Sequence, residues 1–378
     1  MKRYIIIAAM LSFAASGSQA QNAEDEAFLD TSFHTIQDVL WPKKKWKYED
    51  KVSLPQFGGY VIGSYKYSGQ EGAHGGEGFD LRLVRAYVSG TVLHDFKYRL
   101  QVELNNSPHI KDAYLAWSHW QELEVKFGQF KRCFGFENPY NPWDVGFGDY
   151  SQLTKKLTGF GDRCGEPSSG GRDIGVQVQG DFLKIGKDKR RVLHYAVGVF
   201  NGQGINSRDR NNRKDFIANI QGSPIQDLWV GIFAWSGGWT SPDGVPVDRR
   251  RYIIGANYEG RENHLSARFE YAHSKGHKAS DFVAATETEN PYWKGGGKAD
   301  AWYITVGYPI WKWIKVYAKY DMYRDYATKA SSHNIFGLAV NAQPHKNLKL
   351  QLQYNYHNDH TALDREYSQF WVQTYVRF

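Results

Sequence analysis

The sequence contains little cysteine, little methionine and, beyond its first twenty residues, no long apolar run. It has two cysteines and three methionines in 378 residues. A helix that crosses a bilayer needs about 20 consecutive apolar residues, and no segment after Ala20 approaches that length. Helical membrane spans are therefore excluded. The formal net charge is +7, which becomes +5 once Lys2 and Arg3 are removed. Such a mildly basic chain is not expected to bind nucleic acid.

The first twenty residues have the layout of a secretory signal peptide. Lys2 and Arg3 begin it, an apolar run follows at 4–13, and small residues lead to Ala20. We expect cleavage after Ala20, which would make Gln21 the first mature residue. No cysteine follows this site, which argues against a lipoprotein. Residues 21–56 contain no predicted strand, and we expect them to form a periplasmic segment of unknown role.

Aromatic residues are plentiful although the chain as a whole is polar. They make up 16% of the residues, with 25 Tyr and 13 Trp, while the mean hydropathy is −0.60. A transmembrane β-barrel has this composition because only alternate strand residues face lipid and because Tyr and Trp gather at the two membrane interfaces. A soluble all-β sandwich of extracellular type is the alternative, but it rarely needs so many strands of even length.

Alternating polar and apolar residues predict sixteen antiparallel strands, an even number as bacterial barrels require. A change of phase between Arg82 and Arg85 predicts a bulge in the second strand. The barrel is expected at 57–378. The predicted strands are 57–67, 78–90, 95–105, 110–117, 122–130, 172–181, 192–201, 215–221, 228–236, 251–259, 264–274, 301–308, 313–323, 334–341, 347–357 and 368–378.

The connections alternate between short and long, as expected for periplasmic turns and outer loops. The link at 182–191 is an exception, because it is long and basic for a turn. The longest link, 131–171, is the third outer loop. Because sixteen strands enclose a wide channel, this loop is predicted to fold inward as a constriction; capping the rim is the alternative. Its basic residues are Lys131, Arg132, Lys155, Lys156 and Arg163.

The last strand ends on an aromatic residue and is expected to close the barrel. Its apolar face would meet lipid while Gln373 and Arg377 face the other way. The residues on the predicted lipid face are Phe370, Val372, Val376 and Phe378.

The two cysteines, Cys133 and Cys164, both lie in the long third loop. In an oxidising exported compartment an even pair predicts a disulfide. The alternative is two free thiols. A bridge would stabilise the loop by roughly 3–4 kcal/mol in the entropic model.

Charged residues predicted to face the lumen are nearly balanced in sign. Eight acidic positions oppose nine basic ones, so no ring of one charge is predicted. The acidic positions are Glu103, Asp112, Glu122, Glu124, Asp173, Glu259, Glu270 and Asp321. The basic positions are Lys97, Arg99, Lys126, Arg251, Arg268, Lys315, Lys319, Lys349 and Arg377.

Four stretches carry a family resemblance: Ile110-Lys-Asp-Ala-Tyr-Leu115, Val125-Lys-Phe-Gly-Gln-Phe-Lys131, Arg172-Asp-Ile-Gly-Val-Gln-Val178 and Tyr195-Ala-Val-Gly-Val-Phe-Asn-Gly202. With them the chain resembles the phosphate-selective porins O and P. The resemblance implies an outer-membrane trimer of sixteen-stranded barrels in which basic residues guide phosphate-like anions. This chain has Cys133-Phe134 where the family usually has Pro-Phe one residue earlier, so details of the third loop do not carry over.

The sequence therefore predicts an outer-membrane porin for passive diffusion of small hydrophilic solutes, with a mild preference for anions such as phosphate. An oligosaccharide-type channel and a non-transport adhesin or structural barrel are the alternatives. No catalytic residue, metal or cofactor is predicted, and the protein is not expected to be an enzyme. Expected partners are small anions, outer-membrane lipid, lipopolysaccharide, the barrel-assembly machinery and two further copies in a homotrimer.

Overall fold

The computed structural model describes residues 53–71, 76–105, 108–187, 189–260, 264–278 and 297–378. The predicted signal peptide and most of the predicted periplasmic segment at 21–56 lie outside these residues. Within them, no helix is both long enough and apolar enough to cross a membrane.

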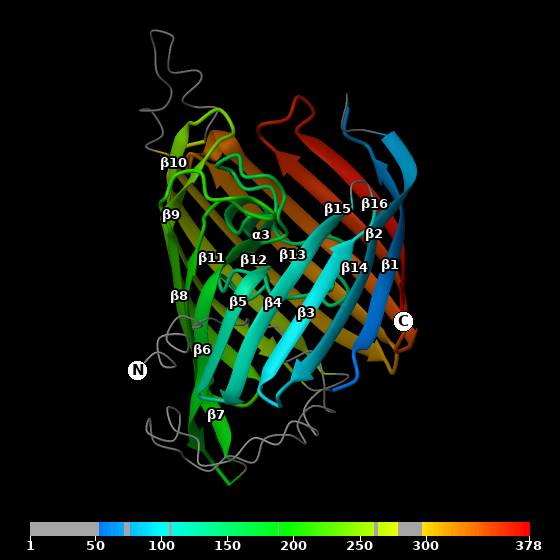
Figure 1. Ribbon diagram of the computed structural model, residues 1–378. Helices are drawn as coiled ribbons and strands as arrows, with labels where there is room; N and C mark the ends of the chain where they lie inside the picture. Colours follow the sequence, from blue (N-terminus) through cyan, green and yellow to red (C-terminus); the bar gives the residue numbers. More distant parts are fainter. Residues whose placement is uncertain (1–52, 72–75, 106–107, 188, 261–263, 279–296) are drawn as a thin grey trace.

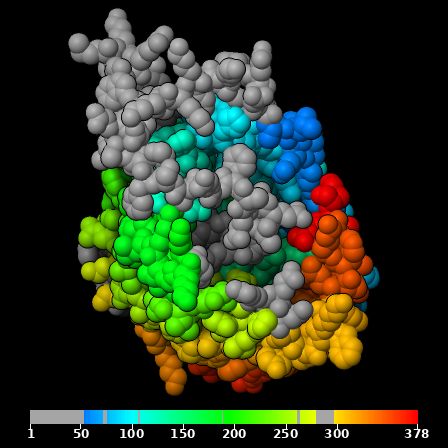
Figure 2. Space-filling model, turned by 90° about the horizontal axis from the view of Figure 1, so that it is seen from below, coloured from blue at the N-terminus to red at the C-terminus, as the bar shows by residue number. Residues whose placement is uncertain are grey.

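The described residues form sixteen antiparallel strands, each paired with its neighbours in sequence, and β1 pairs with β16 to close a barrel (Figure 1). Seen from the end with the short turns, the strands form a ring that runs in sequence order from blue to red (Figure 2). The predicted strand number is confirmed. The strands are β1 Gln56–Ser68, β2 Gly76–Val92, β3 Phe96–Glu103, β4 His109–Trp120, β5 Leu123–Lys131, β6 Arg172–Ile185, β7 Arg190–Phe200, β8 Asp215–Gly222, β9 Leu228–Thr240, β10 Pro246–Glu259, β11 Ser266–Lys275, β12 Lys298–Trp311, β13 Ile314–Asp325, β14 Ser332–His345, β15 Leu348–Asp359 and β16 Glu366–Arg377.

The alternation of side chains gives the barrel an apolar outside and a polar inside. In β15, Leu350 and Leu352 point outward and are 47% and 50% exposed. Between them on the inner face, Lys349, Gln351 and Gln353 are buried. A wall that is apolar on the outside needs lipid around it, because so much exposed apolar surface would be unfavourable in water.

The C-terminal strand closes the barrel as predicted. Its register against β1 runs from Tyr60 opposite Arg377 to Ser68 opposite Gln369. The backbone of Phe378 exchanges two hydrogen bonds with Gly59, each 3.0 Å. A Cβ on Gly59 would lie 2.7 Å from the Phe378 ring, so glycine is needed there to admit the terminal aromatic side chain. The four apolar residues of the predicted lipid face are all exposed on the outside: Phe370, Val372, Val376 and Phe378.

Of the five register shifts between paired strands, two lie away from the short turns, in β2 and β4. The register of β1 with β2 passes from Leu83 directly to Leu81, leaving Arg82 as the extra residue. This confirms the predicted irregularity in the second strand. The register of β3 with β4 likewise skips Lys111, which alternation alone did not anticipate. Each bulge adds a basic side chain to the inner face.

Some connections are shorter than predicted. β6 continues to Ile185 and β7 begins at Arg190, so the exceptional link at 182–191 shortens to residues 186–189. β9 and β10 also extend beyond their predicted ends, leaving only 241–245 between them. The strands continue into polar segments because the backbone hydrogen bonds between strands do not depend on the side chains.

Gly128 in β5 occupies a position that no larger residue can take. Its φ is +130°, and a Cβ there would lie 2.2 Å from the carbonyl oxygen of Ala113 and 2.8 Å from the Cα of Tyr114. Backbone strain of this kind costs about 1–3 kcal/mol before the clash is counted. We expect Gly128→Ala to lower the fraction of folded barrel, measured by heat-modifiable mobility on a gel. Gly63→Ala is the matched control, because a Cβ at Gly63 meets nothing within 4 Å; equal yields of the two variants would contradict the prediction.

Candidate functional site

The third loop, residues 132–171, folds inside the barrel and packs against its inner wall (Figure 1). The alternative that it only caps the rim is therefore wrong. Aromatic side chains of the loop meet aromatic side chains of the wall edge to face, which is a favourable arrangement for such rings. The pairs are Phe134 with Trp235 at 5.2 Å between ring centres, Phe136 with Phe233 at 5.1 Å, Trp143 with Tyr375 at 5.7 Å and Phe147 with Tyr317 at 6.4 Å.

Two wall glycines make room for the loop. Gly231 of β9 and Gly255 of β10 are opposite each other in the ladder. A Cβ on either would lie 3.1 or 3.3 Å from the Phe136 ring. Phe136 therefore sits in a recess of the wall that only glycine leaves open, and its neighbour Glu137 is placed at the inner face.

A short helix, α3 (Gln152–Leu157), rests against β11, β12 and β13. Ser151 caps it, its hydroxyl accepting from the Thr154 amide. The amide of Gln152 donates to both oxygens of Asp321, at 3.1 and 3.0 Å. Sequence reasoning missed this helix; its signal was the capping serine followed by Leu153 and Leu157 at helical spacing.

The middle of the loop is held by side-chain amides of the wall. Gly148 donates its amide to Gln353 at 2.6 Å. The Gly146 carbonyl accepts from Asn341 at 2.8 Å and from Gln351 at 2.9 Å. The neutral amide side chains of Asn341, Gln351 and Gln353 thus hold this part of the loop against β14 and β15.

A buried ion-pair network ties the two ends of the loop to the wall. Arg132 contacts Glu166 at 3.0 Å and Asp173 at 2.8 Å. Arg249 pairs with the same Glu166 and, at 2.7 Å, with Asp215. All five side chains have 0% exposure. Buried charges persist only when paired and hydrogen-bonded, so the three carboxylates are fully engaged by the two arginines and by backbone amides.

A second buried pair joins the loop to β10. Arg251 donates to Asp162 at 2.5 and 2.6 Å, and to the carbonyl of Leu157 at 2.7 Å. Although burial by itself favours the neutral acid, the guanidinium holds the pKa of Asp162 well below its usual range. Asp162 therefore stays ionised and anchors the loop.

The five basic loop residues have different roles. Arg132 and Arg163 are anchors, since Arg163 binds Asp325 at 3.0 Å. Lys131 donates to the carbonyls of Asn138 and Tyr140 at 2.6 and 2.7 Å. Lys155 pairs with Asp149 at 2.5 Å in a partly exposed position, and Lys156 is exposed.

The predicted lumen cations divide into paired and unpaired groups. Arg251 is bound as described, Arg268 lies 3.8 Å from Glu137, and Lys319 lies 3.5 Å from Asp321. The others contact aromatic faces or solvent. Their distances to ring centres are 4.1 Å for Arg99 to Tyr87, 3.9 Å for Lys126 to Tyr114, 5.4 Å for Lys315 to Tyr317, 3.9 Å for Lys349 to Tyr375 and 4.7 Å for Arg377 to Trp143, while Lys97 is exposed.

The unpaired cations all lie on one continuous part of the wall, from β13 through the closure to β5, which we call the basic arc. None of them forms an ion pair with another described residue. Seven described lumen or loop carboxylates similarly have no lysine or arginine within 4 Å, and two of them, Asp181 and Asp359, pair only with a histidine. The seven are Asp80, Glu124, Asp144, Asp181, Glu259, Glu270 and Asp359. The members of the basic arc are Lys66, Arg82, Lys97, Arg99, Lys126, Lys131, Lys315, Lys349 and Arg377.

Alternation did not identify Lys66, Arg82, Arg85 or Lys111 as lumen residues. Arg82 and Lys111 enter through bulges, and only the former had a sequence signal. Arg85 is paired with Glu103 at 2.5 Å, and Lys111 approaches the same carboxylate at 3.5 Å. The bulges thus make the β2–β4 wall more basic than a strict alternation of inward and outward residues predicts.

The predicted disulfide is absent, and both cysteines are free and buried. Cys133 packs in the main apolar cluster with Phe134 and Trp235, whereas Cys164 packs with Trp239 in another. The buried ion pairs, rather than a bridge, hold the ends of the loop. Burial raises the pKa of each thiol to about 12, so neither is a reactive thiolate at neutral pH.

We expect both thiols to resist a maleimide reagent in the folded barrel and to react fully after denaturation. Each side chain is about 1% exposed, and only the thiolate reacts readily. Mass spectrometry of intact protein should show no added label before denaturation and two afterwards. A single cross-linked peptide under non-reducing conditions would overturn this result.

We expect Asp162→Ala to loosen the loop, because it leaves the buried Arg251 without its carboxylate. Removing one partner of a buried pair typically costs about 3–5 kcal/mol. Labelling of the nearby Cys164 in the folded barrel should become faster. Asp149→Ala is the matched control, since its partner Lys155 is 40% exposed and exposed pairs contribute about 0–1 kcal/mol. Similar labelling rates in the two variants would count against the anchoring role.

Comparison with solved structures shows the porin fold over nearly the whole chain. The anion-selective porin from Comamonas acidovorans superposes with a TM-score of 0.62 at 14% identity, covering 86% of this chain and 99% of that chain. In-vitro folded OmpT of Vibrio cholerae gives 0.57 at 14% identity, with 86% and 97% covered. The outer-membrane channel DcaP of Acinetobacter baumannii gives 0.56 at 12%, with 88% and 99% covered.

The family comparison is confined to the first half of the barrel. No curated protein sequence matches the chain significantly. A family model described as phosphate-selective porin O and P matches residues 57–225, and the four stretches that carried the resemblance lie inside this segment. Residues 57–225, which include β2 to β8 and nearly all of β1, are therefore similar to the phosphate-selective porins O and P, and the barrel as a whole has the porin fold.

Proposed function

We propose that this protein is an outer-membrane porin that lets small hydrophilic solutes diffuse passively and prefers anions. The observation that supports this most directly is the basic arc. Nine cations there have no carboxylate partner among the described residues, against seven lumen or loop carboxylates without a lysine or arginine partner, and the nine are gathered on one part of the wall. Lumen charges select ions of opposite sign.

Anchoring the loop neutralises four of the carboxylates inside the barrel. Glu166, Asp173, Asp215 and Asp162 are all neutralised by arginines at 0–1% exposure. The near balance of charges counted along the strands is therefore misleading for a permeating ion. Screening at physiological salt extends over about 8 Å, so a solute near the arc responds mainly to its cations.

The arrangement favours a general anion preference over a tight phosphate site. The arc is distributed over seven strands, β13, β15, β16, β1, β2, β3 and β5, rather than gathered in one ring. Several of its members already contact aromatic rings. A distributed field raises the local anion concentration without binding one anion strongly.

The aromatic side chains give little support for an oligosaccharide channel. Such a channel needs free ring faces, but the inward rings are occupied. Trp235 is contacted by Arg132, Arg249 and Arg251 at 4.8 to 5.0 Å. Tyr303 donates to Glu270 at 2.5 Å and is fully buried. We therefore retain the anion porin as the single proposal.

Several related assignments belong to the same proposal. The signal peptide at 1–20, the periplasmic segment at 21–56 and the constriction role of the loop fit a secreted porin. A homotrimer is proposed because OmpT of Vibrio cholerae has a trimer form. Lipopolysaccharide and the barrel-assembly machinery are proposed partners. No catalytic residue, cofactor or metal is assigned, and the described residues hold no cluster of three or more metal-ligating side chains.

The test is the reversal potential of single channels in a planar bilayer with a potassium chloride gradient. We expect chloride to be favoured, and we expect Arg82→Gln with Arg99→Gln and Arg377→Gln to shift the reversal potential toward cation selectivity. The three arginines are half-buried on the inner wall, so their charges reach the permeating ion. The shift should shrink at 1 M salt, where screening extends over only about 3 Å.

A matched variant removes the same charge away from the lumen. Lys312, Lys346 and Arg365 are exposed in connections at the two ends of the barrel. Replacing these three by Gln should leave the reversal potential nearly unchanged. Cation selectivity of the native channel would refute the anion preference, and absence of channels from correctly folded protein would refute the porin assignment.

A further inference from the structure

Three basic side chains form a row on the outside of the barrel, at the outer ends of β10, β11 and β12. Arg250 is directly opposite Lys275 in one ladder, and Lys275 is directly opposite Lys298 in the next. All three are exposed, the side chain of Arg250 to 66%. Like charges directly opposite each other destabilise a sheet, so this row requires an explanation.

Nearby carboxylates do not neutralise the row. Asp248 is 4.0 Å from Arg250, but it is also bound by Arg213. Asp300 is taken by Arg324, which donates to it at 2.9 Å. Within the described part of the chain, Lys275 and Lys298 form no ion pair. Among the described residues, the outer end of these strands therefore carries unbalanced positive charge.

The residues below the row have the profile of a membrane interface. Tyr252 follows Arg250 on the outer face of β10, and His273 follows Lys275 on β11, with 5.5 Å between their ring centres. Tyr271 lies 6.4 Å from Tyr252. Next come the aliphatic and aromatic residues of the lipid face, among them Ile254, which is 46% exposed. Tyrosine rings in this position mark the head-group level, so the cations lie among lipid head groups.

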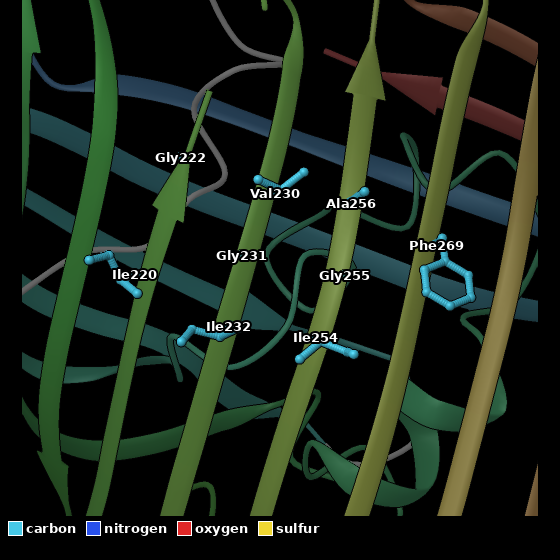
Figure 3. Close-up of a pocket in the computed structure, with 9 residues that line it drawn as sticks. All are labelled: Ile220, Gly222, Val230, Gly231, Ile232, Ile254, Gly255, Ala256 and Phe269. Atoms are coloured by element: carbon cyan, nitrogen blue, oxygen red, sulfur yellow. The ribbon is translucent and has the colours of Figure 1, made fainter. Parts of the chain in front are cut away.

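The same wall contains an apolar hollow farther down. Figure 3 shows residues of β8, β9, β10 and β11 around it, and its volume is about 490 Å³. Gly222 leaves its floor open, because a Cβ there would meet only one atom, 4.0 Å away. The lining residues are Ile220, Gly222, Val230, Gly231, Ile232, Ile254, Gly255, Ala256 and Phe269.

The distance between row and hollow matches one lipid leaflet. Ile254 and Ala256 are four and six residues from Arg250, or about 13 and 20 Å along the strand. For a strand tilted by about 40°, the longer distance corresponds to a depth of about 15 Å. This is half of a hydrocarbon core of about 30 Å. An acyl chain whose head group contacts the row can therefore end in the hollow.

We propose that this face of β8 to β12 binds a phosphorylated lipid of the outer leaflet, with phosphate on Arg250, Lys275 and Lys298 and an acyl chain in the hollow. Phosphate supplies the negative charge that the row lacks, and lysine and arginine are its usual partners. The inference rests on the proposed membrane location but not on conduction. Failure of the channel assignment would leave it standing.

The test is native mass spectrometry of the detergent-solubilised full chain, titrated with diphosphoryl lipid A. We expect a saturable lipid adduct. Arg250→Gln with Lys275→Gln and Lys298→Gln should weaken it by roughly 100-fold, since each basic residue near an anionic lipid contributes about fivefold. Gly222→Leu, which adds a side chain at a position where a Cβ meets only one atom, 4.0 Å away, should weaken the adduct while the row is intact. The Lys312, Lys346 and Arg365 triple variant is the control of equal charge and should bind as the native chain does.

Further measurements separate the possible sources of phosphate. Inorganic phosphate should neither bind at lipid concentrations nor displace the adduct; if it does, the site recognises free anions and the lipid proposal is wrong. Unchanged adducts in the row variant would also overturn it. The proposal would also be overturned if, in lipid-free oligomers, a second copy of the chain protected Lys275 and Lys298 from an amine-labelling reagent. Heat-modifiable mobility confirms that each variant is folded.

Discussion

The buried ion pairs between the third loop and β6 to β10 are the interaction on which the rest of the interior depends. A closed barrel of sixteen strands is too wide for its side chains to fill. A long loop must then be placed inside and held there against its conformational entropy. Arg132, Arg249 and Arg251 do this by engaging carboxylates from both loop and wall. Removing a partner would leave a charge buried and unpaired, so the position of the loop is strongly defined.

This anchoring also determines the electrostatics of the lumen. The pairs concentrate acidic side chains on one part of the wall and neutralise them there. The nine cations of the basic arc, between β13 and β5, have no carboxylate partner among the described residues, and several contact aromatic rings instead. A structural requirement, holding the loop, thus generates the charge asymmetry on which an anion preference depends. Stability and selectivity are linked through the same carboxylates.

The outer surface obeys a different constraint. Lipid imposes an apolar belt, aromatic rings at its margins and polar groups beyond them. β10 to β12 follow this order closely, with Ile254 below Tyr252 and Arg250 above it. Small residues such as Gly222 and Ala256 interrupt the belt and leave a hollow in it. Because successive side chains of a strand point to opposite faces, the inner face of these strands can hold the loop while their outer face contacts lipid.

The sequence alone determined the barrel, its strand number and the direction in which most side chains point. These follow from period-two alternation and from a C-terminal strand ending on Phe378, both of which are local patterns. The bulge near Arg82 was also visible as a change of phase, whereas the one at Lys111 was not. One extra residue makes the side chains that follow it point to the opposite face, but its position is defined only by the pairing with the neighbouring strand.

Only the tertiary structure decided which charges are free. Arg251 and Lys349 look alike in alternating strands, yet one is paired with Asp162 and the other contacts the Tyr375 ring. The separation of Cys133 from Cys164 likewise depends on where the loop docks. The sequence places both cysteines in one loop, but Cys133 packs in a cluster with Trp235 and Cys164 packs in a separate cluster with Trp239. Such pairings join residues far apart in the chain, so packing rather than local pattern selects them.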